Sequence, residues 1–144
     1  MTTLKTIIGF VLVGVTMEIF WTSILDAIKN KDPKLTGTSY LWMFPIYAVV
    51  PFFYVLVLEY FPDTNIFLKG FIYMSLFYLL EFVSGYIVKT LVGVSPWDYN
   101  GYSIKFHGRK YKSNFMGLIC LQYAPVWYIY GIIGEYYFNY LSQM

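Results

Sequence analysis

Two glutamates stand in the middle of long apolar stretches of this chain. Glu18 lies within an apolar stretch at residues 7–25, and Glu81 lies within another at residues 67–92. A carboxylate at membrane depth is costly, so such residues usually face a protein interior and mark an ion or proton pathway. Two carboxylates that meet in a low dielectric cannot both stay charged without a proton or cation between them. The pattern therefore predicts a polar intramembrane site that binds or passes a small cation, a proton or a cationic solute.

Both glutamates have polar or aromatic neighbours at helical spacing. Trp21 comes three residues after Glu18, and Ser84 comes three residues after Glu81, so each pair shares one face of a helix. We interpret the two glutamates as charge-bearing ligands of the site. Two neutral amides of the last apolar segment complete the predicted binding set: Asn114 and Gln122. The alternative that the two acids are protonated and only hydrogen-bond helix to helix stays open.

The chain breaks its helical pattern after the second of these glutamates. Gly93 and Pro96 end the helix, and the tripeptide Trp97-Asp98-Tyr99 follows on irregular backbone. Aspartates in turns accept hydrogen bonds from nearby backbone N–H groups, and aromatic rings suit the depth of the lipid headgroups. We expect the tripeptide to be a gate or cap on a re-entrant or interfacial loop, and we favour the cap for Asp98.

Other residues with reactive side chains are few. His107 is the sole histidine and Cys120 the sole cysteine, so no zinc-site spacing is present. Without nucleotide-binding or hydrolase motifs, we predict no cofactor, leave a metal ion undetermined and lean away from an enzyme. An interfacial enzyme on lipid headgroups, with Asp98 and His107 as acid and base, is the alternative, and a structural or regulatory subunit is a third. We expect water to reach Glu59 and Glu135, near helix ends.

The elements that must position these residues are membrane helices. The 144 residues are 58% hydrophobic and only 12% charged, whereas soluble domains are about a quarter charged. Each long apolar run approaches the roughly 20 residues that a bilayer crossing needs. We predict an all-α polytopic membrane protein that forms a four-helix transmembrane bundle. The bundle is a single domain over residues 1–144, with helices at 6–27, 40–61, 67–92 and 114–140.

Basic residues are distributed unevenly between the predicted loops. With four crossings, one side carries Lys5 and Lys69, and the other side carries eight lysines and arginines. Basic loops stay in the cytoplasm, so we predict cytoplasmic loops at 28–39 and 93–113, with both termini outside or lumenal. A net charge of +2 gives no basis for nucleic-acid binding. The expected partners are the lipid bilayer, with a second copy of the chain or another membrane subunit.

Several of these residues carry a resemblance to a known family. The matching stretches are residues 14–22, with their glycine and glutamate, residues 81–85, residues 96–99, and residues 114–124 with Trp127 after them. Together they resemble the transmembrane protein 229 family and the similar CmpB-like proteins labelled "putative ABC-transporter type IV". The resemblance implies a multi-pass membrane protein. An ATP-driven pump would need a separate nucleotide-binding subunit.

Two departures from the family pattern stand out. Gln122 occupies a position where many members carry a glutamate, which leaves one acid fewer at that level. Residues 103–112 look like an insertion before the last helix. If the site of the family needs that acid, this chain binds a different ion or has an altered activity.

Overall fold

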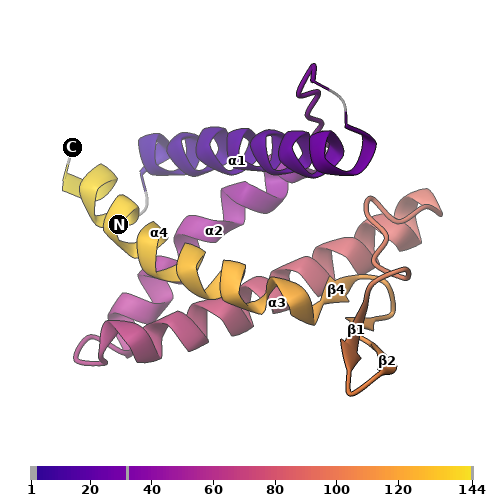
Figure 1. Ribbon diagram of the computed structural model, residues 1–144. Helices are drawn as coiled ribbons and strands as arrows, with labels where there is room; N and C mark the ends of the chain where they lie inside the picture. The colour runs from indigo at the N-terminus through magenta and orange to yellow at the C-terminus, as the bar shows by residue number, and fades with distance from the viewer. Residues whose placement is uncertain (1–2, 32, 144) are drawn as a thin grey trace. The chain divides into compact units, whose positions relative to one another are not determined.

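The computed structural model describes residues 3–31 and 33–143, most of which are helical. Figure 1 shows the order of the elements along the chain. Three helices are long and apolar enough to cross a membrane: α1 (Leu4–Asn30), α2 (Met43–Tyr60) and α3 (Ile66–Val92). A short 3₁₀ turn, η1 (Leu121–Tyr123), leads into α4 (Ala124–Gln143). The chain is therefore mainly helical, as its apolar runs predict.

The prediction of an all-α fold is wrong between α3 and α4. Two small antiparallel hairpins lie there, formed by β1 (Ser103–Phe106) with β2 (Arg109–Lys112) and by β3 (Asn114–Phe115) with β4 (Ile119–Cys120). The first hairpin spans the stretch that looks like an insertion. Its turn is made by His107 and Gly108, both at positive φ, which is the conformation that two-residue hairpin turns require.

The last helix begins at Ala124 and not at residue 114. Met116 and Gly117 have φ values of 53° and 71°, and the N–H of Leu118 donates to the carbonyl of Phe115 at 3.0 Å. A right-handed helix cannot pass through two such residues, so the chain turns back as the β3–β4 hairpin. A Cβ on Gly117 would lie 2.7 Å from the side-chain nitrogen of Asn100, so glycine also suits the space available.

The chain divides into two compact units, of which the first comprises Met1–Val55 and Phe138–Met144. The side chain of Thr3 caps the start of α1 by accepting from the backbone N–H of Thr6. The core of this unit is a cluster of three aromatic rings with centroids 5.3 to 6.4 Å apart. All three are at least nine-tenths buried: Phe10, Tyr54 and Phe138.

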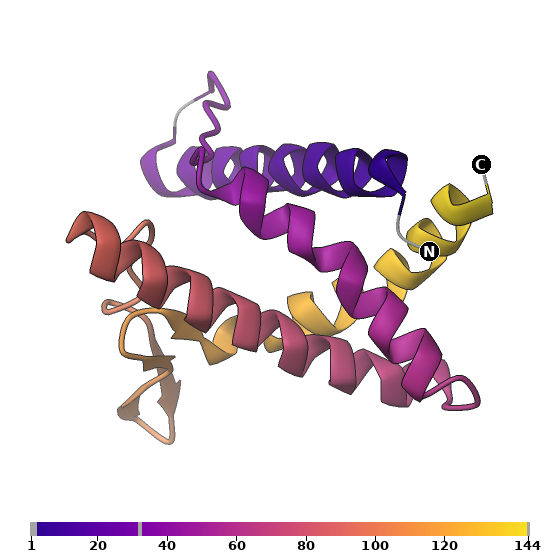
Figure 2. The same ribbon diagram turned by 180° about the vertical axis from the view of Figure 1, so that it is seen from behind.

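The second unit, Leu56–Tyr137, holds α3, both hairpins and most of α4. Aromatic side chains join the two helices: the ring of Phe77 lies 6.0 Å from that of Trp127, and Phe71 lies 4.9 Å from Tyr128. Both views show the hairpins beside the C-terminal part of α3 (Figures 1 and 2). This unit therefore brings Glu81, the loop after α3 and the start of α4 into one region.

Candidate functional site

The carboxylate of Glu81 is almost completely buried on α3. Only 9% of the residue is exposed. The hydroxyl of Tyr99 donates a hydrogen bond to its Oε1 at 2.8 Å. The other oxygen, Oε2, has no hydrogen-bond partner within the described residues. A buried polar atom without a partner is costly, and most such atoms bind water, an ion or a ligand.

The indole of Trp127, near the start of α4, lies beside this carboxylate. Its Nε1–H is buried and, like Glu81 Oε2, has no hydrogen-bond partner in the part of the chain that the structure describes. The ring is held between Phe77 and Tyr130, with centroid distances of 6.0 and 6.2 Å. An unpartnered donor therefore stands beside an unpartnered acceptor in a closely packed aromatic setting. In the sequence, Trp127 stands out only through the family resemblance, and nothing there indicates that it lies beside Glu81.

The loop after α3 carries Tyr99 to the carboxylate. The indole N–H of Trp97 donates to the carbonyl of Leu118 at 2.8 Å, and the N–H of Tyr99 donates to the carbonyl of Gly117 at 2.9 Å. Both bonds fasten the tripeptide to the β3–β4 hairpin. A Cβ on Gly85 would lie 3.0 Å from the Trp97 ring, so a glycine at this position lets the ring pack against α3.

Tyr99 acts as a permanent hydrogen-bond donor in this arrangement. Burial, and after it the negative charge of Glu81, raise the pKa of the Tyr99 hydroxyl well above its usual value. The phenol therefore stays protonated at every physiological pH. Its ring packs against Tyr102 and Tyr123, each at a centroid distance of 5.5 Å, which keeps the hydroxyl directed at Glu81.

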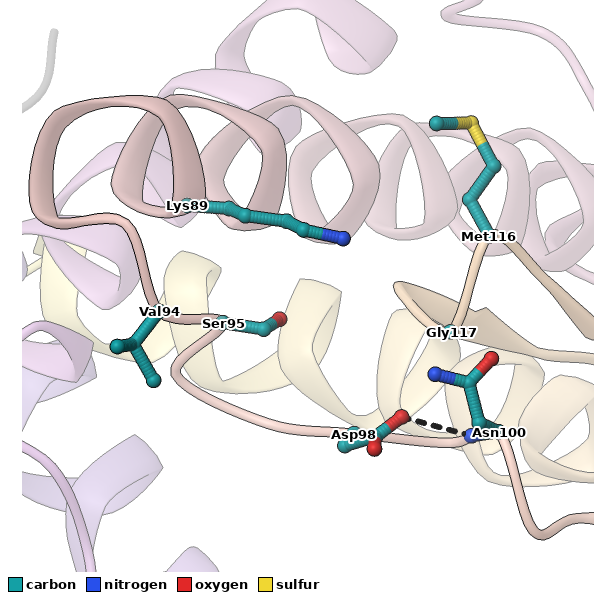
Figure 3. Close-up of a pocket in the computed structure, with 7 residues that line it drawn as sticks. All are labelled: Lys89, Val94, Ser95, Asp98, Asn100, Met116 and Gly117. Carbon is teal, nitrogen blue, oxygen red and sulfur yellow. Dashed lines mark hydrogen bonds between the residues drawn. The ribbon is translucent and has the colours of Figure 1, made fainter.

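The side chain of Asp98 makes a local hydrogen bond within the loop after α3. Its Oδ1 accepts a hydrogen bond from the backbone N–H of Asn100 at 2.8 Å (Figure 3). This is the bond by which aspartates mimic a backbone turn. Whether Asp98 acts as a cap or as a gate stays a prediction.

Replacing Asp98 tests that assignment. We expect Asp98→Ala to destabilise the loop by about 1 kcal/mol because the N–H of Asn100 loses its acceptor. Asp98→Asn should keep a stability close to that of the wild type because asparagine keeps an acceptor at the same place. Melting temperatures and activity of both variants in detergent check this. If Asp98→Asn were as inactive as Asp98→Ala while both stayed fully stable, the residue would be a gate.

The other predicted acid, Glu18, has a different partner. Its Oε2 accepts a hydrogen bond from the hydroxyl of Ser39 at 2.7 Å, in the loop between α1 and α2. Sequence reasoning missed Ser39, because a serine in a polar loop gives no signal of such a contact. Trp21 is 43% exposed on the same helix. Glu18 and Glu81 belong to different units, so their pairing stays a prediction.

The remaining residues of the predicted binding set make local bonds. The hydroxyl of Ser84 donates to the carbonyl of Leu80 at 2.6 Å, within its own helix. The amide of Asn114 donates to the carbonyl of Tyr102 at 3.2 Å, and that of Gln122 donates to the hydroxyl of Ser113 at 2.9 Å. These two amides link parts of the hairpin region, and their predicted role as neutral ligands stays a prediction.

A second buried acid in this unit corrects a sequence-based expectation. Glu135 is only 8% exposed, so the expectation that water reaches it is wrong. Its Oε1 lies 3.4 Å from the ammonium of Lys69, which is itself buried, and its Oε2 accepts a hydrogen bond from the hydroxyl of Tyr73. The sequence offers only a weak signal for this pair: Lys69 stands in the first turn of one apolar helix, and Glu135 stands inside another.

The helices of this chain indicate its class, and its sequence indicates its family. Three helices that are long and apolar enough to cross a membrane make this chain a mainly helical membrane protein. It belongs to the family described as "Putative ABC-transporter type IV", CmpB, which matches residues 6–144. The match confirms the resemblance to CmpB-like proteins. No solved structure matches the chain.

Proposed function

We propose that the chain is a transporter-like membrane protein that takes up and releases a proton at Glu81. The observation that carries the proposal is the buried carboxylate oxygen of Glu81, which has no partner among the residues described. The family description, with its word transporter, supports movement of a solute across a membrane. Intramembrane carboxylates mark proton relays in many pumps and transporters.

The surroundings of the carboxylate favour a proton over a metal ion. Two of its neighbours present hydrogen-bond donors: the Tyr99 hydroxyl donates to Oε1, and the indole of Trp127 has an N–H and no acceptor. Hard cations need several oxygen ligands around them. A proton on Oε2 needs only this one carboxylate. The donors stabilise the carboxylate after the proton has left, so the site can cycle between both states.

The other predicted residues take roles around this centre. Glu18 would be the second proton-exchanging acid, kept in place by Ser39. Trp97 and Asp98 would hold the loop that presents Tyr99, and Asn114 and Gln122 would secure the hairpins on which the loop rests.

Proton flux into vesicles tests the proposed function. The purified full chain is reconstituted into liposomes that contain a pH-sensitive dye, and a pH gradient is imposed with valinomycin and potassium to compensate charge. We expect the internal pH to equilibrate faster than in vesicles without protein. Equal rates in both preparations over the whole pH range would reject proton passage by this chain.

The topology forms part of the proposal. We propose four crossings, with loops 28–39 and 93–113 in the cytoplasm, because these loops carry seven of the ten basic residues and Lys89 lies in the last turn of α3 on the same side. Single cysteines placed at Lys31 and Lys110 in a Cys120→Ala background should react with an impermeant maleimide only after the cells are permeabilised. Reaction at either position in intact cells would reverse or break the proposed orientation.

A further inference from the structure

A separate polar cavity lies at the C-terminal end of α3. It has a volume of about 220 Å³ and is formed by the last turns of α3, the loop after the helix and the β3–β4 turn (Figure 3). Its polar lining consists of four side chains: Lys89, Ser95, Asp98 and Asn100. Glu81 is not among the lining residues, so this cavity is distinct from the proton site.

Three of these side chains bring hydrogen-bond donors to the cavity. The Lys89 side chain extends into it from α3, and the Ser95 hydroxyl faces the same space (Figure 3). The hydroxyl of Ser95 is buried and lacks a partner within the residues described, and Lys89 forms no ion pair among them. The side-chain nitrogen of Asn100 also points into the cavity (Figure 3). An ammonium, a hydroxyl and an amide are the donors that bind a phosphate group.

The fourth polar side chain, Asp98, adds a negative charge at the opposite wall. One of its oxygens accepts from the N–H of Asn100, which leaves the second oxygen for another donor. Within the described chain, it makes no ion pair with Lys89, although both line the same cavity. A bare phosphate would be repelled by this carboxylate. A ligand with a phosphate at one end and an ammonium at the other matches both charges.

The position of the cavity indicates that the ligand belongs to a lipid. Helix α3 is a candidate membrane span that ends at Val92, so the cavity lies where lipid headgroups are expected. Val94 and Met116 line it and are exposed by half or more, as are three large apolar residues close to the lining residues in the chain: Leu91, Val92 and Phe115. Such side chains suit acyl chains beside a polar headgroup.

We propose that this cavity binds the headgroup of a phospholipid that carries a primary ammonium, of the phosphoethanolamine class. Lys89, Ser95 and Asn100 hold the phosphate, and the second oxygen of Asp98 accepts from the ammonium. A choline headgroup, which has no N–H, and a glycerol headgroup, which has no positive charge, each lack one of these interactions.

Native mass spectrometry of the delipidated full chain in detergent tests the proposal. Dioctanoyl phosphatidylethanolamine is titrated in parallel with the phosphatidylcholine and phosphatidylglycerol of the same chain length and with free phosphoethanolamine. We expect phosphatidylethanolamine to bind about tenfold more tightly than the other two lipids, the effect of one charge-assisted hydrogen bond. Equal affinity for the three lipids would overturn the proposal. Free phosphoethanolamine that bound as tightly as the lipid would overturn the lipid as the source of the headgroup.

Variants of Lys89 and Asp98 test which of the two binds the phosphate and which binds the ammonium. Lys89→Gln should weaken phosphatidylethanolamine binding about tenfold, and Asp98→Asn should remove the preference over phosphatidylglycerol. Asparagine keeps the acceptor for Asn100, so the loop stays folded, as its melting temperature will show. Unchanged affinity and preference in both variants would overturn the site.

Matched controls separate this site from general charge effects and from the proton site. Lys112→Gln on β2 and Asp63→Asn in the turn before α3 remove the same charges at exposed positions, and both should bind like the wild type. Glu81→Gln should also keep the wild-type lipid affinity. A loss of affinity in Lys112→Gln equal to that in Lys89→Gln would show non-specific attraction and overturn the proposal.

Discussion

Replacing Glu81 by glutamine should reduce proton flux into reconstituted vesicles to the rate of vesicles without protein. Glutamine keeps an oxygen that accepts from the hydroxyl of Tyr99, so the local bond of the wild type survives. It cannot take up or release a proton, and the exchange step is lost. The internal dye signal measures the flux, and a melting curve in detergent confirms that the variant is folded.

Two further variants show whether a loss of flux in Glu81→Gln is specific to that residue. Glu59→Gln changes an exposed acid at the end of α2 and should keep the wild-type rate. Glu18→Gln should abolish flux as well if the two acids share a proton. If the two acids only join helices, both Glu81→Gln and Glu18→Gln should keep their flux and lose at most about 1–2 kcal/mol of stability. Wild-type flux in Glu81→Gln would therefore refute the proton site.

Removing Glu135 should lower the free energy of unfolding by about 3–5 kcal/mol, because the buried ammonium of Lys69 would lose its counter-charge. Glu135→Gln is the test variant, measured by unfolding in detergent with increasing SDS. Tyr73 can still donate to the glutamine oxygen, so the substitution keeps this hydrogen bond and removes only the negative charge.

The double variant Lys69→Met with Glu135→Gln provides the control for this effect. It removes both charges together, so we expect it to regain most of the lost stability. The difference between the single and double variants measures the coupling between the two groups. A Glu135→Gln protein as stable as the wild type would show that the ion pair does not offset the cost of burying the Lys69 ammonium.

The sequence predicted the helices better than the segment between α3 and α4. Long apolar runs indicate membrane helices directly, and Gly93 with Pro96 marks the end of α3. The hairpins have strands of only two to four residues, too short for an alternating pattern. Their turns use His107-Gly108 and Met116-Gly117 in place of the commoner Asn-Gly, so the turn signal is weak as well.

The sequence predicts the acid of the candidate site, Glu81, but not the residues that contact it. The depth of Glu81 within an apolar run is visible in the sequence. Its bond to Tyr99 depends on a packing arrangement in which Gly85 and Gly117 let the loop approach α3 and the hairpin. Contacts of this kind join residues distant in sequence and leave no periodic pattern. The same holds for Lys69 and Glu135, which lie 66 residues apart.

Infrared spectroscopy of the reconstituted full chain gives the most direct test of proton exchange at Glu81. The spectrum is followed while the pH is stepped, and the carboxylic C=O stretch is compared between the wild type and its variants. The proposed function predicts a reversible carboxylic-acid band in the wild type and in Glu59→Gln that is missing from Glu81→Gln. Identical bands in the wild type and Glu81→Gln would contradict it.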